Sequence, residues 1–422
     1  VWQIVNDHLR QRSPADGGFL LSTPFTATLT LLALALLALA GHCFVFYPLS
    51  LRLFCRKAPN PELSPALAPR PSLAICLSAY NEEKVIVAKV ERLLEVARAY
   101  GPATIHVYAD APSDRTVALL EPYADRIDLV VGKARAGKTY GMNLLVGRSE
   151  SELILFTDAN VESDNGCAVE LARPFADPTI GCVTAHLIYS NRRESPTSAI
   201  GALYWRLEEA IKRIESHTVG VIGVDGAMFM LRRSLYQPPP PHLIDDLYLS
   251  LRVLIAGARI HSADHVRVFE RSAVGAVEEK QRKRRIACQA ANVHRVLWPE
   301  LRRMPWLQLY AYLSHRVMKW LTPFFLGAGA LCLIAAVALA YGAAMATAVV
   351  AAGLAALLIG HSLEVRPFSA LSSATLSLAG VAAGVLESLF TRRTYTVWDP
   401  ALSIRAETLS LNHGKSGGPN AR

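Results

Sequence analysis

Long apolar runs without charge constrain this chain more than any other feature of its sequence. Thr26 to Pro48 contains no Asp, Glu, Lys or Arg and is about as long as the roughly 20 helical residues that cross a bilayer. A cleaved signal peptide would lie nearer the start of the chain and end in a small-residue cleavage site, so we expect a retained anchor. Because 52% of the 422 residues are hydrophobic, we expect a protein that is partly membrane-embedded and partly soluble.

Two further apolar regions lie nearer the other end of the chain. Leu321 to Gly360 is long enough for a helical hairpin, and Ser369 to Phe390 carries Glu387 as its one acidic or basic residue. With the anchor they predict four membrane spans. The basic residues that follow the anchor place the region after it in the cytoplasm. Three later spans would then leave Arg392-Arg393 on the opposite side, against the same rule, so either one segment re-enters or the count is wrong.

The apolar pattern divides the chain into regions and predicts a multi-pass protein of the inner cell membrane. We expect an N-terminal region with a membrane helix (1–50), a cytoplasmic domain (51–300), an interfacial helix (301–320), C-terminal membrane helices (321–393) and a tail (394–422). A Pro- and Ala-rich linker (59–71) precedes the soluble fold. Ala199–Glu215 and Met304–Trp320 are amphipathic and aromatic, which suits a membrane interface; the first fits a core-packing helix equally well.

Strand-like runs alternate with helical patterns in the first half of the soluble domain. The strand-like runs are Leu73–Leu77, Ile105–Tyr108, Ile127–Val131 and Leu153–Phe156, and helical patterns follow the first three at 82–99, 115–123 and 139–146. This alternation predicts an α/β fold with a mostly parallel, Rossmann-like sheet and helices on both faces. In such sheets ligands bind at the carboxyl ends of the strands.

Polar side chains follow each of these strands. The segments are SAYNEE (78–83), ADAPSD (109–114), GKARAGKT (132–139) and TDAN (157–160). Taken singly, Asn81 or Asp114 fits a helix cap, Asp110 a turn and Lys138 a solvated lysine. Because the carboxyl ends of parallel strands meet at one edge, we expect these side chains to share one crevice instead.

Gly132–Thr139 also satisfies the P-loop pattern G-x-x-x-x-G-K-[ST]. It follows a strand and opens a helix, and Asp158 would supply a magnesium ligand, so a P-loop ATPase is a rival interpretation. It leaves the two earlier strand ends without a role and puts the motif in mid-sheet.

Acidic and basic residues in the second half of the domain suit group transfer. Asp245-Asp246 precede an amphipathic run and fit either a helix start or a general base, for which Asp246 is our choice because a neighbouring acid raises a carboxylate's basicity. The run EEKQRKRRIACQ (278–289) concentrates cations. Such a run is typical of a membrane-flanking helix, and also of a site that stabilises a leaving diphosphate.

These motifs resemble those of the inverting membrane glycosyltransferases of family 2, related to cellulose, chitin and hyaluronan synthases. The resemblance covers about Pro71 to Trp298 and implies the GT-A fold and transfer of a sugar from a nucleotide-sugar, UDP-linked, to a glycan or lipid-linked acceptor. Six motifs of that family match successive segments of this chain. They are the AYNE-type segment, the acid after the second strand, the Gly-Lys with a following Asn, the D-x-D metal motif, the acidic base motif and the Q-x-x-R-W motif.

The resemblance also implies roles for individual residues. Those implied to hold the nucleotide-sugar are Ala79, Tyr80, Glu82, Asp110, Asp114, Lys138, Asn143 and Asp158. Those implied at the acceptor or diphosphate are Gln281, Arg282, Arg284 and Arg285. Asp246, beside Asp245, would be the base, and Asp158 with Asn160 would hold Mg²⁺ or Mn²⁺.

Two departures from the family pattern matter. Asn160 stands where a second Asp is usual, and a neutral amide oxygen holds a hard cation less strongly, so we expect a weakened metal site. Arg285 stands where processive synthases carry Trp, which favours short or single transfer.

Composition restricts the partners and the compartment. The net charge of +9 is explained by membrane flanks and an anionic substrate, and without alternating aromatic and basic residues we expect no nucleic acid. The seven cysteines form no CxxC pair, which predicts reduced thiols. A homo-oligomer or an export partner remains open, as do a non-catalytic nucleotide-sugar-binding protein and, with little support from its spans, a transporter.

Overall fold

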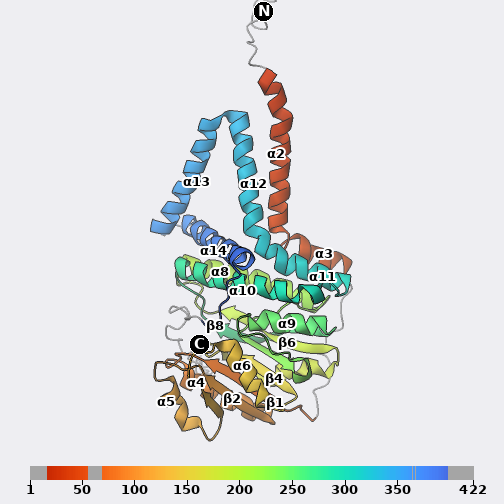
Figure 1. The fold of residues 1–422 in the computed structure, drawn as a ribbon, viewed down its shortest axis with the longest axis vertical. Coiled ribbons are helices and arrows are strands. Elements are labelled where there is room, and N and C mark those ends of the chain that lie inside the picture. Colours follow the sequence, from red (N-terminus) through yellow and green to blue (C-terminus); the bar gives the residue numbers. More distant parts are fainter. Residues whose placement is uncertain (1–16, 56–68, 364, 366, 398–422) are drawn as a thin grey trace, which may run out of the picture.

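The computed structural model describes residues 17–55, 69–363, 365 and 367–397 (Figure 1). Most of the predicted linker (59–71) and of the tail (394–422), and the first 16 residues, therefore lie outside the described residues. Within the described part, the soluble domain is built on an eight-stranded sheet with the order β3-β2-β1-β4-β7-β6-β8-β5. Its strands are β1 Leu73–Ala79, β2 Ala103–Ala109, β3 Asp128–Val131, β4 Leu153–Thr157, β5 Glu162–Ser163, β6 Ile180–Tyr189, β7 Met228–Arg232 and β8 Arg259–Glu270.

The α/β fold class is confirmed, and the four strands predicted by the alternation pair in parallel. Leu73 lies opposite Ala103 on β2 and opposite Leu153 on β4. The other half of the sheet is mixed: β7 is antiparallel to both β4 and β6, and the short β5 is antiparallel to β8. An apolar run such as Met228–Leu231 shows that a strand is buried but not which way it runs, so these directions were not predictable from the pattern.

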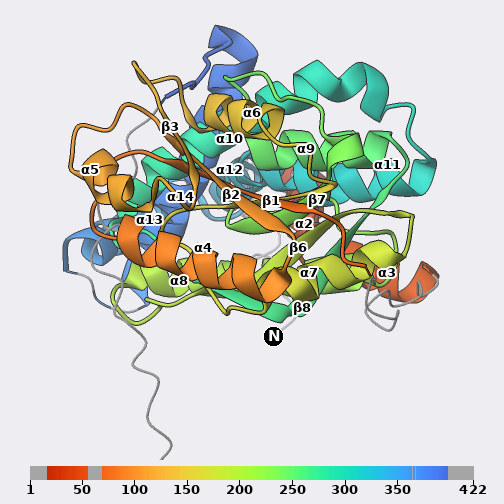
Figure 2. The same ribbon diagram turned by 90° about the horizontal axis from the view of Figure 1, so that it is seen from below.

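Helices cover both faces of the sheet because successive side chains of a strand point to opposite sides. Leu73, Ile75 and Leu77 of β1 enter one core, while Ala74 and Cys76 enter the other. Figure 2 shows α4 and α6 on opposite faces. The helices of the first core include α4 Ile86–Tyr100, α5 Thr116–Leu120 and α7 Cys167–Ala172, and those of the second include α6 Lys138–Gly147, α9 Asp245–Ile255 and α10 Ala276–Leu301.

The helix predicted from Glu82 begins later, at Ile86. The backbone N–H of Glu82 donates to Thr116 Oγ1 (2.8 Å) and that of Glu83 to Asp114 Oδ2 (3.1 Å). These amides bind the neighbouring loop, and the segment turns before it becomes helical.

Within the part of the chain that the structure describes, four helical stretches are long and apolar enough to cross a membrane: Pro24–Gly41, Trp306–Tyr341, Ala343–Leu363 and Phe368–Thr391. They fall on α2 Gly17–Gly41, on α11 Trp306–Tyr312 with its continuation into α12 Met318–Tyr341, on α13 Ala343–Leu363 and on α14 Phe368–Leu386. Figure 1 shows α2 and α12 running side by side away from the sheet, with α13 returning toward it.

The helix α14 lies differently from the other three. It runs across the soluble domain and packs along α10, with further contacts to α8 Pro196–Ser216. A Cβ atom at Gly380 would stand 2.5 Å from the carbonyl oxygen of Lys280, and one at Gly384 would meet that of Arg284. Two glycines one turn apart thus allow the backbones of α14 and α10 to touch.

A layer of helices separates the sheet from the membrane stretches. It contains α3 Phe46–Phe54, α8, α10 and α11, and a π-helical turn at Leu313–Val317 joins α11 to α12. The helix α8 starts with a capping box in which Ser195 and Ser198 each bind the other's backbone N–H. The predicted interfacial segment Met304–Trp320 is therefore α11, the π-helical turn and the start of α12.

Candidate active site

One cavity of about 960 Å³ opens at the carboxyl ends of β1, β2 and β4. It is lined by residues from distant parts of the sequence, among them Asp110, Lys138, Asp158 and Asp246. The parallel strands bring the first three to one edge, and the start of α9 adds the fourth. The cavity also borders α8, α10 and the start of α12.

Asp110, after β2, holds the loop that precedes α6. Its carboxylate accepts the backbone N–H groups of Ala136 (2.7 Å) and Gly137 (3.0 Å), and the Tyr108 hydroxyl donates to it (3.1 Å). Gly137 has φ +93°, a conformation that favours glycine. A P-loop would turn such amides toward phosphate. Because Asp110 already occupies them, this geometry argues against the P-loop interpretation of Gly132–Thr139.

The rim beside Asp110 is formed by the segment after β1. The Arg135 guanidinium lies 3.6 Å from the centroid of the Tyr80 ring, a cation–π contact, and both residues line the cavity together with Ala79 and Glu82. Asn81, with φ 52°, binds Ser113 of the next loop through both ends of its amide. The first two strand ends therefore form one wall.

Lys138 lies between carboxylates. Its Nζ is 2.7 Å from Asp158 Oδ1 and 3.5 Å from Asp245 Oδ2. Burial acts to lower the pKa of Lys138, but Asp158 and Asp245 together raise it above its ordinary value. The lysine is therefore a fixed cation at the point where the fourth strand end meets α9.

Asp246 and Glu270 are lining carboxyl groups whose pKa is raised to about 7, Glu270 by burial first of all. Burial and the adjacent Asp245 raise the pKa of Asp246 to about 7, opposed by Lys138. A Cβ atom at Gly226 would lie 3.3 Å from Lys138 Nζ and 3.5 Å from Asp246 Oδ2. The loop after α8 therefore approaches both charged groups closely.

Asp158 and Asn160 both line the cavity, but together they offer a metal ion only one carboxylate and one amide. Among the described residues no cluster of three or more His, Cys, Asp or Glu side chains is arranged to hold a metal ion. The amide nitrogen of Asn160 donates to Glu270 Oε1 (3.2 Å), and Asp158 is paired with Lys138. A carboxylate and an amide oxygen fit a hard cation that takes its other ligands from a bound diphosphate and water.

Cations from α10 line the cavity on the side that faces the long apolar helices. Gln281, Arg282, Arg284 and Arg285 all belong to the lining. Arg282 lies 3.5 Å from Glu279, and Arg284 pairs with Glu387 of the turn that follows α14. Burial, with some help from Arg282, lowers the pKa of Arg285 to about 10, so the guanidinium stays charged at neutral pH.

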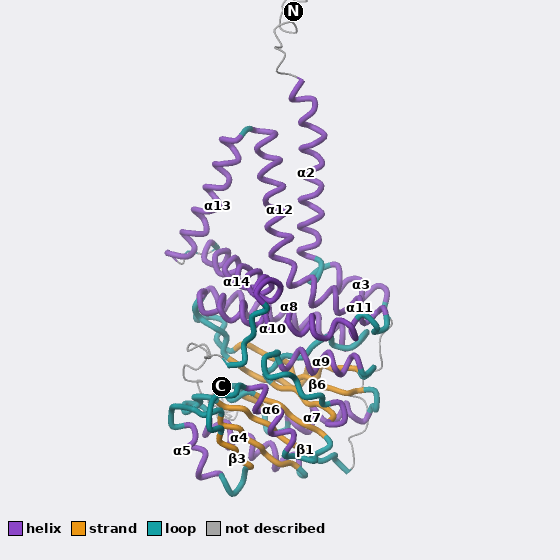
Figure 3. Tube along the Cα trace, viewed as in Figure 1, coloured by secondary structure: helices purple, strands orange, loops and turns teal. Residues whose placement is uncertain are grey.

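The segment after α14 closes one side of the cavity. Arg393, Tyr395 and Val397 are lining residues, and the backbone of Thr396 contacts Gly137. The Gln289 amide on α10 donates to the carbonyl of Tyr395 (3.0 Å). Figure 3 shows this segment descending from α14 toward α6. No periodic pattern marks it in the sequence, where it was assigned partly to the tail.

Two of the residues implied to hold the nucleotide-sugar are not among the lining residues. The Asp114 carboxylate accepts the N–H of Thr116 (2.9 Å), and Asn143 donates to the carbonyl of Pro239 (2.9 Å). Sequence reasoning in turn did not assign several lining residues to the site. They are Arg135 in the loop after β3, Gly226 in the loop before β7, Glu270 at the end of β8, and Trp205, Glu208 and Arg316 on helical segments.

Comparison with known proteins identifies the domain. The sequence profile of "Glycosyltransferase like family 2" matches residues 69–288. An N-acetylglucosaminyltransferase of Rhizobium sp. (strain N33) is 24% identical over 206 residues, 45% of this chain and 46% of the relative. That of Azorhizobium caulinodans is 25% identical over 213 residues, 46% of this chain and 54% of the relative. This chain thus spans about half the length of these curated relatives.

A solved structure supports the fold over most of the chain. Mannosyltransferase PcManGT from Pyrobaculum calidifontis, in complex with GDP-Man and Mn²⁺, superposes with a TM-score of 0.64 at 21% identity, covering 86% of this chain and all of that one. The family profile covers more than half of the chain and lies over the sheet and the cavity described above. The protein is therefore a member of glycosyltransferase family 2 with a GT-A fold.

Proposed function

We propose that this protein is a membrane-embedded inverting glycosyltransferase that moves a sugar from a nucleotide-sugar, UDP-linked, to an acceptor hydroxyl. The observation that carries this proposal is the gathering of Asp110, Lys138, Asp158 and Asp246 around one cavity. Family membership and the N-acetylglucosaminyltransferase activity named for the bacterial relatives support it.

Each part of the cavity has a role in this reaction. Tyr80, Arg135 and Asp110 form the wall against which the nucleoside would rest. Lys138 and the α10 arginines would stabilise the diphosphate as negative charge builds on its oxygens. A divalent cation held by Asp158 and the amide oxygen of Asn160 would neutralise further charge on that leaving group.

Asp246 would act as the base. It would accept the proton of the acceptor hydroxyl as the oxygen attacks the anomeric carbon from the side opposite the diphosphate, which inverts the configuration there. A pKa of about 7 suits this role because a general base works best when its pKa lies near the working pH.

We also propose that α2, α12 and α13 cross the inner cell membrane, while α14 lies along its cytoplasmic face. The close backbone contact between α14 and α10 supports this arrangement. With three spans, Arg392-Arg393 stand on the same side as the catalytic domain, which removes the conflict with the positive-inside rule.

The experiment uses the purified chain in membranes with labelled UDP-N-acetylglucosamine, UDP-glucose and GDP-mannose, with and without Mn²⁺. We expect transfer from one UDP-sugar, and a loss of about 10²- to 10⁴-fold in Asp246→Asn with donor binding retained. Glu150→Gln, which changes a carboxylate whose side chain is 88% exposed, is the matched control and keeps wild-type rates.

The outcomes separate the alternatives. Equal transfer in Asp246→Asn overturns the assignment of the base. Nucleotide-sugar binding without release of UDP in the wild type supports a non-catalytic binding protein. ATP hydrolysis that is lost when Lys138 is changed and unaffected when Asp246 is changed supports the P-loop ATPase interpretation.

A further inference from the structure

We propose that the cavity-facing side of α8 is the acceptor subsite, and that the group it binds is a neutral sugar ring rather than a lipid phosphate. This inference rests on the proposed transferase function. Tyr204, Trp205, Glu208 and Lys212 line the cavity. Their spacing of three to four residues places them on one face of the helix. The lining continues through Asp225 and Gly226 to Asp246, the proposed base.

Three polar atoms on α8 or on the π-helical turn beside it are buried and have no hydrogen-bond partner of good geometry among the described residues. They are Trp205 Nε1, Glu208 Oε1 and Arg316 Nε. The side chain of Glu208 is only 4% exposed, and a buried polar atom left unpaired is costly. Packing of the indole against Tyr189, at 5.7 Å between ring centroids, explains the position of the ring but leaves its N–H unsatisfied.

The hydroxyl groups of a sugar match the chemistry of all three atoms. A hydroxyl is able to accept a hydrogen bond from Trp205 Nε1 or Arg316 Nε, and to donate one to Glu208 Oε1. An ionised phosphate accepts from the first two but has no proton to give, and it would face the Glu208 carboxylate as a like charge. The mixture of two donors and one carboxylate acceptor therefore favours a polyhydroxyl ring.

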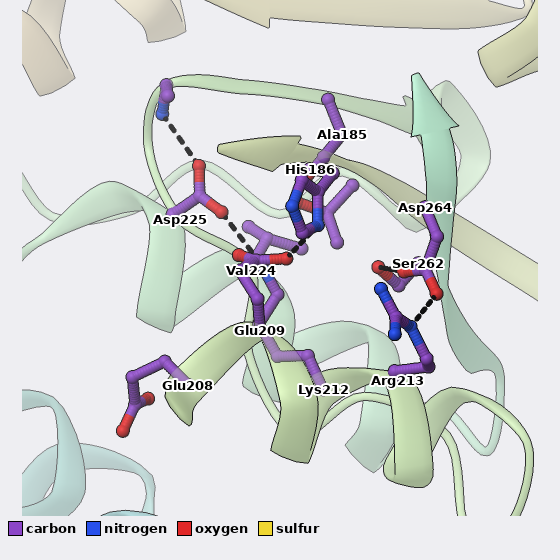
Figure 4. A network of polar contacts seen from close by, with 12 residues as sticks. Ala185, His186, Glu208, Glu209, Lys212, Arg213, Val224, Asp225, Ser262 and Asp264 are labelled. Atoms are coloured by element: carbon purple, nitrogen blue, oxygen red, sulfur yellow. Dashed lines mark hydrogen bonds and ion pairs between the residues drawn. The ribbon is translucent and has the colours of Figure 1, made fainter. Parts of the chain in front are cut away.

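The charges beneath this wall are already paired, which also disfavours an anionic ligand. Lys212 Nζ lies 2.6 Å from Glu209 and 2.9 Å from Asp225, and His186 binds Glu209 at 2.8 Å (Figure 4). Lys319 Nζ lies 2.6 Å from Glu208. Both lysines thus already face carboxylates of the protein, and a phosphate would have to compete with these carboxylates for them.

Among the described residues that line the cavity, α8 supplies the aromatic residues Tyr204 and Trp205, whereas α10 supplies none. Arg285 on α10 lines the same cavity and offers a charge in place of an aromatic ring. Trp205 enters from the neighbouring helix and offers an indole together with an N–H donor. Aromatic rings pack against the C–H faces of sugars through the same apolar contact that they make in cores.

The test compares Trp205→Phe, which removes the N–H and keeps an aromatic ring, with Glu208→Gln, which keeps the size and removes the charge. Acceptors are chito- and cello-oligosaccharides and farnesyl phosphate, with the full chain in nanodiscs. We expect saccharides to accept sugar and the KM for saccharide to rise about tenfold in Trp205→Phe, while the KM for the nucleotide-sugar keeps its wild-type value.

Trp306→Phe, which changes an indole that is 76% exposed on α11, is the matched control and leaves both KM values unchanged. Saturation-transfer NMR with the oligosaccharide alone gives a second readout that needs no turnover, and its signal weakens in Trp205→Phe. Trp205→Phe therefore keeps the test decisive if Glu208→Gln does not fold.

Two results overturn the subsite. One is an unchanged saccharide KM in Trp205→Phe. The other is that the protein transfers sugar to farnesyl phosphate and transfers none to the saccharides. A wild-type protein that releases no UDP from any nucleotide-sugar contradicts the proposed function instead, so the two failures are distinguishable.

Discussion

Asp246 shows how neighbouring charges set the chemistry of a single residue. Burial and Asp245 favour its protonated form, while Lys138 and Arg316 favour the carboxylate. Because a base must be ionised to accept a proton, kcat/KM should rise about tenfold per pH unit below pH 7 and level off above it. A pH–rate profile between pH 5.5 and 8.5 measures this. A profile that is flat through pH 7 contradicts the role of Asp246.

Lys138 allows the same electrostatics to be changed by mutation. In Lys138→Met the ammonium that lowers the pKa of Asp246 is lost, so the acidic limb of the pH–rate profile should shift to higher pH by about one unit. Lys133→Met changes an exposed lysine of the same loop and should leave the limb in place. An unmoved limb in Lys138→Met, with the protein folded, would show that the two groups are not coupled.

The sequence predicted those cavity-lining residues that follow regular strands, and it missed those placed by long-range packing. Asp110 and Asp158 come directly after apolar runs, so their meeting at one edge follows from parallel pairing. Trp205 and Glu208 lie on a helix whose pattern suits a core and an interface equally. Their exposure to the cavity depends on where α8 docks, and no local pattern encodes that position.

At the level of elements, the contact between α14 and α10 explains why the predicted number of spans was ambiguous. Hydropathy and length alone make α14 a candidate span. Gly380 and Gly384 instead let it lie against the backbone of α10, a long-range contact that no window over one segment detects.

This contact predicts a specific sensitivity. Gly384→Val should destabilise the protein by about 1–3 kcal/mol, because the added side chain has no space against Arg284 and α10 must move. Thermal unfolding in detergent or nanodiscs measures the loss. Gly353→Val on α13, where a Cβ atom would meet nothing within 4 Å, is the matched control. Equal melting temperatures for the two variants would argue against tight packing of α14.

For the whole molecule, the orientation of the chain in the bilayer follows from which helices cross it. Tyr341, 74% exposed at the turn between α12 and α13, should lie on the side of the membrane opposite the catalytic domain. Thr394 should lie on the same side as the catalytic domain. In a background with Cys55 and Cys332 replaced, cysteines at 341 and 394 should therefore react with a membrane-impermeant maleimide from opposite sides. Labelling of both from one side would make α14 a fourth span.

The stretch after α14 ties the end of the described chain to the cavity of the candidate active site. Since Tyr395 and Thr396 complete a wall that the sheet itself does not supply, a protein shortened at residue 391 would keep every strand yet expose its donor pocket to solvent. Water would then compete with the proper acceptor, and costly activated sugar would be wasted by hydrolysis. Shortening the chain here would therefore change the yield of the reaction, with the sheet left intact.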